Sequence, residues 1–249
     1  MKRLLCLVGL SLAGTAGTAL ATPRPVVLEL FTSNSCSSCP PAYELLERVT
    51  KSTPDDVQLI RMDLHVDYWN QLNWVDQYSD PAFTERQRKY ARDVFGANRV
   101  YTPQLVVNGR REMVGNNARR VPAAITQSDT PAVQPLALEL SRDGQSVVAA
   151  ITLDKRDVPT AARLWLAITE DRVVSHVGAG ENAGRTLRED GVVRYLQPVE
   201  NLDADNGSYQ HSLALPAGTS SHPLHIVAFV QQTGDHRITA AASQPVTPR

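Results

Sequence analysis

Residues 26–41 hold the most informative pattern of the chain and read V-V-L-E-L-F-T-S-N-S-C-S-S-C-P-P. The run from Pro25 to Ser33 is short, apolar and rich in strand-forming residues, which predicts a buried β-strand. A helix is expected over Pro40–Ser52, because apolar residues recur there at helical spacing and prolines are tolerated in a first helical turn. The two cysteines of the stretch, Cys36 and Cys39, therefore lie where a strand passes into a helix.

The rest of the first half predicts further strands and helices. The Asn108-Gly109 pair is typical of a two-residue hairpin turn, and Asp80 before Pro81 is a candidate helix cap. The expected elements are a strand over Val57–Val66, helical structure over Tyr68–Phe95, a strand over Thr102–Val107, its return over Arg110–Val114 and a helix over Asn117–Gln127.

The chain changes character after residues 128–135, a polar segment with two prolines that is the best candidate for a linker. Short runs follow in which apolar and polar residues mostly alternate, with turn residues between them. Such a pattern is typical of an antiparallel β-sandwich. We therefore expect an α/β domain with a helical insertion at residues 22–128, a linker at 129–135 and an all-β antiparallel sandwich-like domain at 136–249.

The first 21 residues have the features of a secretory signal peptide. Met1-Lys2-Arg3 is short and basic, Leu4–Gly14 is apolar, and Ala19-Leu20-Ala21 offers small residues where a signal peptidase cuts. We expect cleavage after Ala21 and a mature protein in the periplasm or outside the cell. Beyond that point no apolar stretch approaches the roughly 20 residues of a membrane helix, so no membrane span is expected.

The charge balance argues against two classes of partner. Without Lys2 and Arg3 the chain keeps 23 basic and 26 acidic residues, a slight acidic excess. Nucleic acid and anionic lipid attract proteins with a basic excess, so neither is an expected partner. No cofactor is expected either, because the glycine spacing in Gly178–Arg185 does not match a dinucleotide-binding fingerprint.

The cysteines favour redox chemistry. Cys6 leaves with the signal peptide, so Cys36 and Cys39 are the only cysteines of the expected mature protein. A disulfide between residues so close in sequence removes little chain entropy and is a weak structural staple. Zinc would need two more clustered ligands, which the sequence lacks. We expect Cys36 to be the attacking thiolate at the helix start and Cys39 to be the resolving thiol.

The sequence resembles the thioredoxin superfamily in three ordered features. They are the apolar strand, the Cys36-Ser37-Ser38-Cys39 motif that opens a helix, and Tyr101-Thr102-Pro103 before a strand and an Asn-Gly turn. The resemblance implies a cis Pro103 beside the disulfide and a Thr102 backbone that can pair with a substrate peptide. The alternative is an ordinary trans proline that begins a strand.

Five motifs in order extend the resemblance over most of the expected mature chain. They are E-L-F-T-S-N-S-C-S-S-C-P-P, H-V-D-Y-W, P-A-F-T-x-R-Q, V-Y-T-P-Q-L-V-V-N-G and G-E-N-A-G-R-T-L. Together they are similar to a family of secreted bacterial proteins of unknown function, DUF1223. This resemblance implies a thioredoxin-like domain with a β-rich second domain, and no established substrate. It also favours a structured role for Gly178–Arg185 over a flexible surface connection.

Further residues are candidates for the same site. The thioredoxin resemblance implies a buried acid that relays a proton to the second cysteine, for which Glu29 is the nearest candidate; the alternative is an ion-paired strand glutamate. His65, at the end of the second expected strand, is a candidate metal ligand or a modulator of the attacking thiol. Tyr68 and Trp69 are candidate substrate-binding aromatics, and Trp74 fits a hydrophobic core better.

These features favour a secreted or periplasmic thiol–disulfide oxidoreductase whose partners are protein or small-molecule thiols and disulfides. The direction of exchange stays open, because the residues between the cysteines do not fix the reduction potential. One alternative is a soft-metal protein that binds copper through Cys36, Cys39 and His65. Another is a non-catalytic binding module with a permanently closed disulfide.

Overall fold

The computed structural model describes five parts of the chain: residues 22–127, 132–154, 161–202, 207–217 and 222–247. The expected signal peptide at 1–21 and residues 129–131 of the expected linker lie outside the described residues. At the end of the expected linker, Gln134–Pro135 forms the short strand β5.

The part of the chain up to residue 127 forms the elements that carry the cysteines. In order they are β1 (Arg24–Thr32), α1 (Pro40–Ser52), β2 (Val57–His65), the 3₁₀ turn η1 (Asp67–Trp69), α2 (Pro81–Lys89), the π-helical turn η2 (Tyr90–Val94), β3 (Gln104–Val107), β4 (Arg111–Val114) and α3 (Arg120–Thr126). Asp80 caps α2 as expected, because its carboxylate accepts a hydrogen bond from the Ala82 N–H at 2.7 Å. Helix α1 buries its apolar face, as the periodicity predicts.

The described residues after 135 form strands. They are β6 (Ala137–Asp143), β7 (Ser146–Thr152), β8 (Ala162–Glu170), β9 (Val173–His176), β10 (Thr186–Glu189), β11 (Val192–Asn201), β12 (Ser208–Ala214), β13 (Leu224–Gln232) and β14 (Ile238–Pro245). Strands β6, β7 and β12 form a three-stranded antiparallel sheet, and β9 and β10 form a separate two-stranded hairpin.

A single mixed sheet of nine strands takes in segments from both halves of the chain. Its order is β4-β3-β1-β2-β11-β8-β13-β14-β5. Strands β1 and β2 pair in parallel along their whole length, and β11 continues the sheet beside β2 through the parallel pair Val192 and Asp63. From β11 onward to β14 the neighbours are antiparallel.

The expected fold class is therefore wrong. Of the described residues, 44% lie in strands and 18% in helices, and the large mixed sheet stands in place of a thioredoxin-like α/β domain with a helical insertion. The physical reason is that alternation of apolar residues shows which side chains are buried but not which strand lies next to which. Strands β8 and β13 are buried on both faces over most of their length, as central strands of a covered sheet are.

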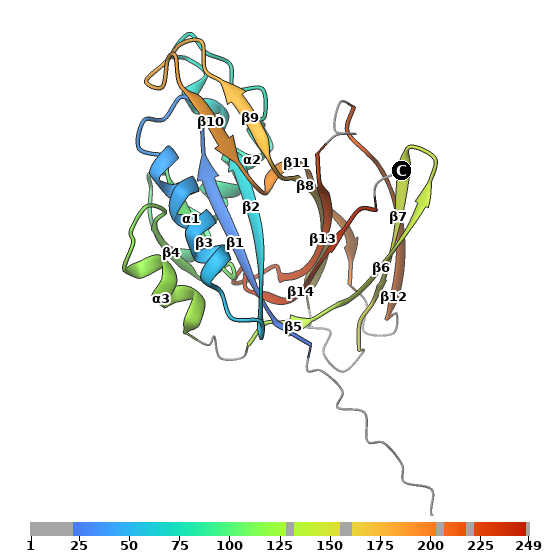
Figure 1. Ribbon diagram of the computed structural model, residues 1–249. Coiled ribbons are helices and arrows are strands. Elements are labelled where there is room, and N and C mark those ends of the chain that lie inside the picture. The colour runs from blue at the N-terminus through green and yellow to red at the C-terminus, as the bar shows by residue number, and fades with distance from the viewer. Residues whose placement is uncertain (1–21, 128–131, 155–160, 203–206, 218–221, 248–249) are drawn as a thin grey trace, which may run out of the picture.

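The three-stranded sheet forms a second layer over one end of the large sheet (Figure 1). One apolar cluster fills the space between them, with Leu138 and Ile151 from the small sheet against Leu164 and Ile226 from the large one. This cluster lies apart from the cysteines, which belong to a different core.

Strand β1 separates two apolar cores, one on each face of the sheet. Val26, Leu28 and Leu30 pack with α1 and both cysteines. The alternate residues Val27 and Phe31 belong to the other core, together with residues of α2 and β13. Because successive side chains on a strand point to opposite faces, each β1 residue is assigned to one core by its position.

The β9–β10 hairpin lies at the end of the large sheet where β1 and β2 finish (Figure 1). Its tip therefore reaches the segment between β1 and α1 that carries Cys36. Among the described residues, no helix combines the length and the apolar character needed to cross a membrane.

Candidate functional site at the cysteine pair

Cys36 and Cys39 form a disulfide at the start of α1, with their Cα atoms 5.4 Å apart. Both cysteines are fully buried, whereas Ser37 and Ser38 between them are exposed. The backbone of the motif is a tight turn in which the Cys39 N–H donates to the Cys36 carbonyl at 3.2 Å. The pair is thus covered by its surroundings and bordered by two hydroxyl groups.

The start of α1 offers few free amides to a thiolate. Pro40 and Pro41 occupy its first positions and carry no N–H. The amides of Ala42 and Tyr43 both donate to the Cys39 carbonyl, at 2.8 and 3.4 Å. The helix dipole still favours an anion here, but the expected backbone donors are absent or engaged among the described residues.

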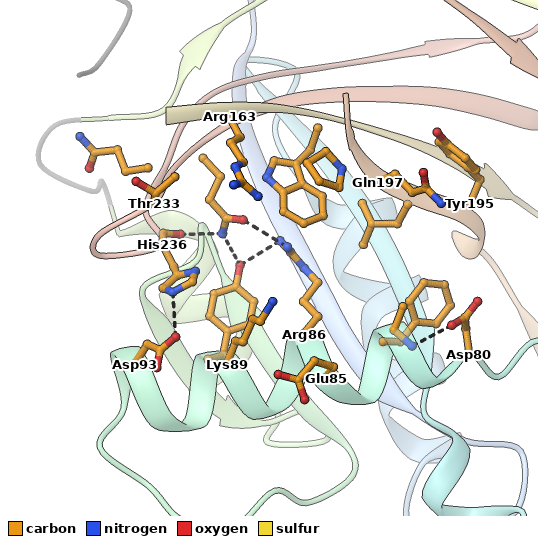
Figure 2. Close-up of a pocket in the computed structure, with 18 of the residues that line it drawn as sticks. Asp80, Glu85, Arg86, Lys89, Asp93, Arg163, Tyr195, Gln197, Thr233 and His236 are labelled. Atoms are coloured by element: carbon orange, nitrogen blue, oxygen red, sulfur yellow. Dashed lines mark hydrogen bonds and ion pairs between the residues drawn. The ribbon is translucent and has the colours of Figure 1, made fainter. Parts of the chain in front are cut away.

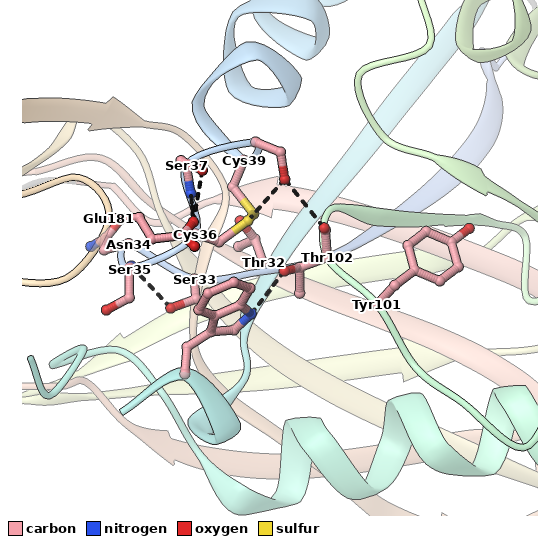
Figure 3. Close-up of a disulfide and its surroundings, with 12 residues drawn as sticks. Thr32, Ser33, Asn34, Ser35, Cys36, Ser37, Cys39, Tyr101, Thr102 and Glu181 are labelled. Atoms are coloured by element: carbon pink, nitrogen blue, oxygen red, sulfur yellow. Dashed lines mark hydrogen bonds between the residues drawn. A yellow bond between two sulfur atoms is a disulfide. The ribbon is translucent and has the colours of Figure 1, made fainter. Parts of the chain in front are cut away.

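A hydroxyl group takes the place of those donors. Ser38 Oγ lies 3.3 Å from Cys36 Sγ, and it also donates to the Thr102 carbonyl at 3.4 Å (Figure 3). The sulfur of a disulfide has no proton, so the Ser38 hydroxyl is the donor in any hydrogen bond between the two. This side chain therefore links the first cysteine to the segment before Pro103.

Thr102 lies beside the disulfide, as expected. The Thr102–Pro103 peptide bond is cis, which confirms that prediction. The indole Nε1–H of Trp69 donates to Thr102 Oγ1 at 2.9 Å, so η1 contributes an aromatic side chain to this side of the site (Figure 3). Tyr68 packs against the other core, and its hydroxyl donates to Gln87 at 3.2 Å and also interacts with the Thr102 side chain, so Tyr68 too lies near Thr102.

The tip of the β9–β10 hairpin covers the other side of the cysteine motif. Glu181 Oε2 accepts hydrogen bonds from the Ser37 N–H at 3.0 Å and the Ser37 hydroxyl at 2.7 Å. The side-chain amide of Asn182, fully buried, donates to the carbonyls of Asn34 and Cys36 at 2.9 and 2.8 Å. The structured role expected for Gly178–Arg185 is confirmed by these contacts.

His65 lies in a buried ionic cluster rather than against the sulfurs. Its Nδ1 is 2.8 Å from Asp76 Oδ2, and its Nε2 is 3.3 Å from Glu189 Oε1 on β10. Burial disfavours the charged imidazolium, but the carboxylates of Asp76 and Glu189 outweigh burial and raise the pKa of His65 to about 9. His65 is therefore a cation between two carboxylates at neutral pH.

This cluster fixes the segment that leads to Cys36. The Asn34 N–H donates to Asp76 Oδ2 at 2.7 Å, the same oxygen that His65 contacts. Oriented with its nitrogen toward Glu189, the Asn34 side-chain amide donates to both carboxylate oxygens at 3.1 Å. The ionic cluster thus holds Asn34, two residues before the first cysteine, by its backbone N–H and by its side chain.

Glu29 is not brought to the cysteines. It shares the β1 face of Val27 and Phe31, opposite the core that contains Cys39. Its carboxylate accepts hydrogen bonds from Arg86 Nε and the Tyr90 hydroxyl, each at 2.5 Å. The structure therefore matches the alternative, an ion-paired strand glutamate, and gives no path for a proton relay to Cys39.

A separate cavity of about 620 Å³ opens beside Arg86, between α2 and the strands β8, β11 and β13 (Figure 2). The Arg86 guanidinium lies 4.6 Å from the ring centre of Trp165 and donates to Gln231 at 3.1 Å. These contacts tie α2 to the strands on that face of the sheet. They lie on the face away from the disulfide.

No cluster of three or more His, Cys, Asp or Glu side chains suited to a metal ion occurs among the described residues. The three ligands of the copper alternative were Cys36, Cys39 and His65. In the structure the two cysteines are bonded to each other, and both nitrogens of His65 face carboxylates.

The part of the chain that matches a known protein family includes this site. Residues 27–231 match the family described as a protein of unknown function, DUF1223. The chain belongs to the DUF1223 family. The matched range includes the cysteine pair, Thr102, the ionic cluster and the hairpin tip, so the whole candidate site lies inside the family region. Among curated proteins, none matches the chain.

Two solved structures are similar to this one over most of its length. Protein AGR_C_4864 from Agrobacterium tumefaciens is 26% identical, with a TM-score of 0.66, and the likeness covers 90% of this chain and 95% of that one. HBP35 of Porphyromonas gingivalis is 13% identical, with a TM-score of 0.64, over 90% of this chain and 76% of that one. These likenesses concern the fold.

Sequence reasoning missed several residues of the site: Ser38, Asp76, Glu181, Asn182 and Glu189. Glu181 and Asn182 lie in the G-E-N-A-G-R-T-L motif, which was the available signal for them. Nothing in the sequence pairs Asp76 or Glu189 with His65, because Asp76 follows in an irregular segment 11 residues later and Glu189 lies on a distant strand.

Proposed function

We propose that this protein is an exported thiol–disulfide oxidoreductase whose reactive group is the Cys36–Cys39 pair. The observation that carries the proposal is the contact of Ser38 Oγ with Cys36 Sγ, at 3.3 Å, in a motif that begins a helix. A hydroxyl donor and the positive end of a helix dipole both favour a thiolate at Cys36. The thiolate is the form of cysteine that exchanges.

The proposed exchange proceeds in two steps. The Cys36 thiolate attacks one sulfur of a substrate disulfide, which forms a mixed disulfide and releases the other substrate sulfur as a thiolate. Cys39, as thiolate, then attacks Cys36 Sγ, which closes the protein disulfide and releases the second substrate thiolate. The substrate disulfide gains two electrons in all, and its two thiolates take their protons from the solvent, which receives those that the two cysteines lose on ionisation. The reverse sequence oxidises a substrate dithiol.

Substrate groups reach the pair beside Thr102 in this proposal. The exposed Ser37 and Ser38 lie between the hairpin tip on one side and Thr102 with Trp69 on the other. The partners are therefore protein or small-molecule thiols that approach along this border. Export to an oxidising compartment, as residues 1–21 lead us to propose, keeps such a pair able to cycle.

A second candidate is a binding module with a permanently closed disulfide. The full burial of both cysteines favours it, because exchange requires a thiolate to reach one of the sulfurs. The two candidates differ in chemistry that can be measured directly.

Trapping of mixed disulfides tests the proposal. We expect Cys39→Ser to accumulate mixed disulfides at Cys36 in extracts that contain oxidised protein, because the resolving thiol is gone. The matched variant Cys36→Ser should accumulate none, since the Ser38 hydroxyl that favours a thiolate contacts Cys36. Non-reducing electrophoresis and mass spectrometry give the readout. Absence of adducts with both variants favours the closed disulfide, and adducts with Cys36→Ser alone would exchange the two roles.

A further inference from the structure

The hairpin tip between β9 and β10 is bound to the disulfide motif by hydrogen bonds. We call residues 178–185 the covering loop. Two of its side chains, Glu181 and Asn182, make four hydrogen bonds to the segment from Asn34 to Ser37. The Asn182 side chain is fully buried between the loop and the cysteine motif, and Cys36 is fully buried as well.

The backbone of the covering loop also approaches the motif closely. Gly180 has φ +79, and a Cβ there would lie 3.2 Å from Ser35 Oγ. A Cβ at Gly178 would lie 2.7 Å from the ring of Trp74, which explains a glycine at that position. The loop is therefore shaped to lie flat against the residues before Cys36.

The covering loop is a compact unit on a narrow base. Its ends are joined by hydrogen bonds from the Gly184 N–H to the Val177 carbonyl at 2.8 Å and from the Val177 N–H to the Arg185 carbonyl at 3.0 Å. Arg185 also donates to the Asn182 side chain at 2.9 Å. The supporting strands β9 and β10 are four residues each and form a sheet of their own. The loop can lift on this base while β9 and β10 stay in place, since Val177 and Leu187 pack in the core with the cysteines and Glu189 contacts His65.

The loop covers the cysteine motif, and the charge of Glu181 adds an electrostatic effect on the ionisation of Cys36. Its carboxylate accepts the N–H and the hydroxyl of Ser37, the residue directly after Cys36, and so places a negative charge on the cysteine motif. A like charge nearby disfavours ionisation of a thiol. The closed loop therefore opposes exchange both by covering Cys36 and by its charge.

We propose that the covering loop is a gate on the Cys36–Cys39 disulfide, closed here by Asn182 and Glu181 and opened when those contacts to Asn34, Cys36 and Ser37 break. The inference rests on the proposed exchange at the same cysteines. Asn182 and Glu181 are positioning residues, since they bond the backbone and hydroxyl around the sulfurs rather than the sulfurs themselves. Their role is to set the rate at which a thiolate reaches the pair.

The rate of reduction by dithiothreitol tests the gate. This reagent forms a mixed disulfide with one protein sulfur and then closes to its own cyclic disulfide, which leaves two protein thiols. Loss of the two Asn182 hydrogen bonds in Asn182→Ala should raise the open population and the reduction rate by about tenfold or more. Glu181→Ala, at an exposed side chain, should give an increase of about three- to tenfold with the fold intact.

Matched controls separate the gate from general loosening. Asn98→Ala and Glu139→Ala change exposed residues away from the loop and should leave the rate within about twofold of the parent. Glu181→Gln keeps an acceptor for Ser37 but removes the negative charge. A reduction rate between those of the parent and Glu181→Ala would show how much of the slowing is due to the charge.

Two outcomes overturn the gate: equal rates for the parent, Asn182→Ala and Glu181→Ala, or a parent rate equal to that of oxidised glutathione under the same conditions. The experiment measures a rate, whereas trapping measures whether Cys36 exchanges with other proteins. Faster reduction of the variants without trapped adducts would keep the gate and remove the proposed function. Trapped adducts together with equal reduction rates for the parent and the loop variants would keep the proposed function and remove the gate.

Discussion

Ser38 is the residue that most directly affects the chemistry of the reactive sulfur. Its hydroxyl lies within 3.3 Å of Cys36 Sγ and 3.4 Å of the Thr102 carbonyl, and it has one proton to donate. Since Pro40 and Pro41 supply no N–H to the helix start, this hydroxyl is the donor for a thiolate that the local geometry provides. On reduction we expect its proton to turn from the carbonyl to the sulfur.

Replacement of Ser38 by alanine should raise the pKa of the reduced Cys36 thiol. The loss of one hydrogen bond to the charged form should slow alkylation at mildly acidic pH by about three- to tenfold. The measurement is the rate of iodoacetamide labelling of each cysteine between pH 5 and 8, followed by mass spectrometry. Ser212→Ala, at an exposed serine on β12, is the control. Superimposable pH profiles for Ser38→Ala and the parent would remove the donor role.

At the scale of elements, the buried His65 cluster joins three segments around the cysteine motif. His65 ends β2, Asp76 lies in the segment between η1 and α2, and Glu189 ends β10. Burial raises the pKa of Glu189, while the pKa of Asp76 stays below its ordinary value despite burial because His65 is charged beside it. The cluster therefore stabilises the fold as long as His65 carries its proton.

The sign of the pH dependence follows from the raised pKa of His65. A raised pKa gives stability that is fully present below the ordinary value of 6.5 and is lost as pH rises through about 9. Asp76→Asn should lower the unfolding free energy near pH 6 by about 3–5 kcal/mol, because it breaks a buried pair. The deficit should shrink by on the order of 1–3 kcal/mol as pH passes 9.

Urea unfolding from pH 6 to pH 10 measures this dependence. Asp143→Asn, at an exposed carboxylate on β6, is the matched control and should track the parent at every pH. If the stability deficit of Asp76→Asn were the same at pH 6 and pH 10, His65 would not be the charged partner.

At the scale of the whole molecule, one junction joins the two halves of the large sheet. The Asp63 N–H on β2 donates to the Gly191 carbonyl at 2.8 Å, just before β11 begins. Gly191 has φ +70, and a Cβ there would lie 2.8 Å from the Arg61 carbonyl oxygen. A side chain at this position is excluded both by the backbone conformation and by the neighbouring strand.

Gly191→Ala should therefore destabilise the protein more than a matched glycine change. Gly96 has φ +61 and open space around it, so Gly96→Ala tests the backbone conformation alone and should cost about 1 kcal/mol. Gly191→Ala should cost about 2–4 kcal/mol, because the strands must also separate. Thermal or urea unfolding of both variants provides the comparison. Equal losses of unfolding free energy in the two variants would mean that β2 and β11 can move apart at this junction at no cost.

Much of the local structure was predictable from the sequence. The strand before Cys36, the helix after Cys39 and the cap at Asp80 depend on short patterns, and the structure has all three. The cis bond before Pro103, which the structure also has, was expected from the thioredoxin resemblance. The assembly of the sheet was not predictable in this way. Nothing in the β11 sequence indicates that it pairs with β2 rather than with strands of its own half alone.

The candidate site was predictable to a similar degree. The cysteines and Thr102 do lie together, because a strand end, a helix start and the Pro103 turn meet there. Glu29 shows the limit of spacing arguments, since its position on β1 assigns it to the opposite face. The covering loop comes from a distant hairpin, and its contact with Ser37 spans 144 residues of sequence.

The reduction potential of the Cys36–Cys39 pair distinguishes a thiol–disulfide exchanger from a permanently closed disulfide. Equilibration of the full protein in glutathione buffers of defined ratio, with thiol content read by mass spectrometry after acid quenching and alkylation, gives the value. A thiol–disulfide oxidoreductase should have a potential between about −120 and −270 mV, the range of known exchangers. A value far below about −300 mV would contradict the proposed function and identify the pair as a permanently closed structural disulfide.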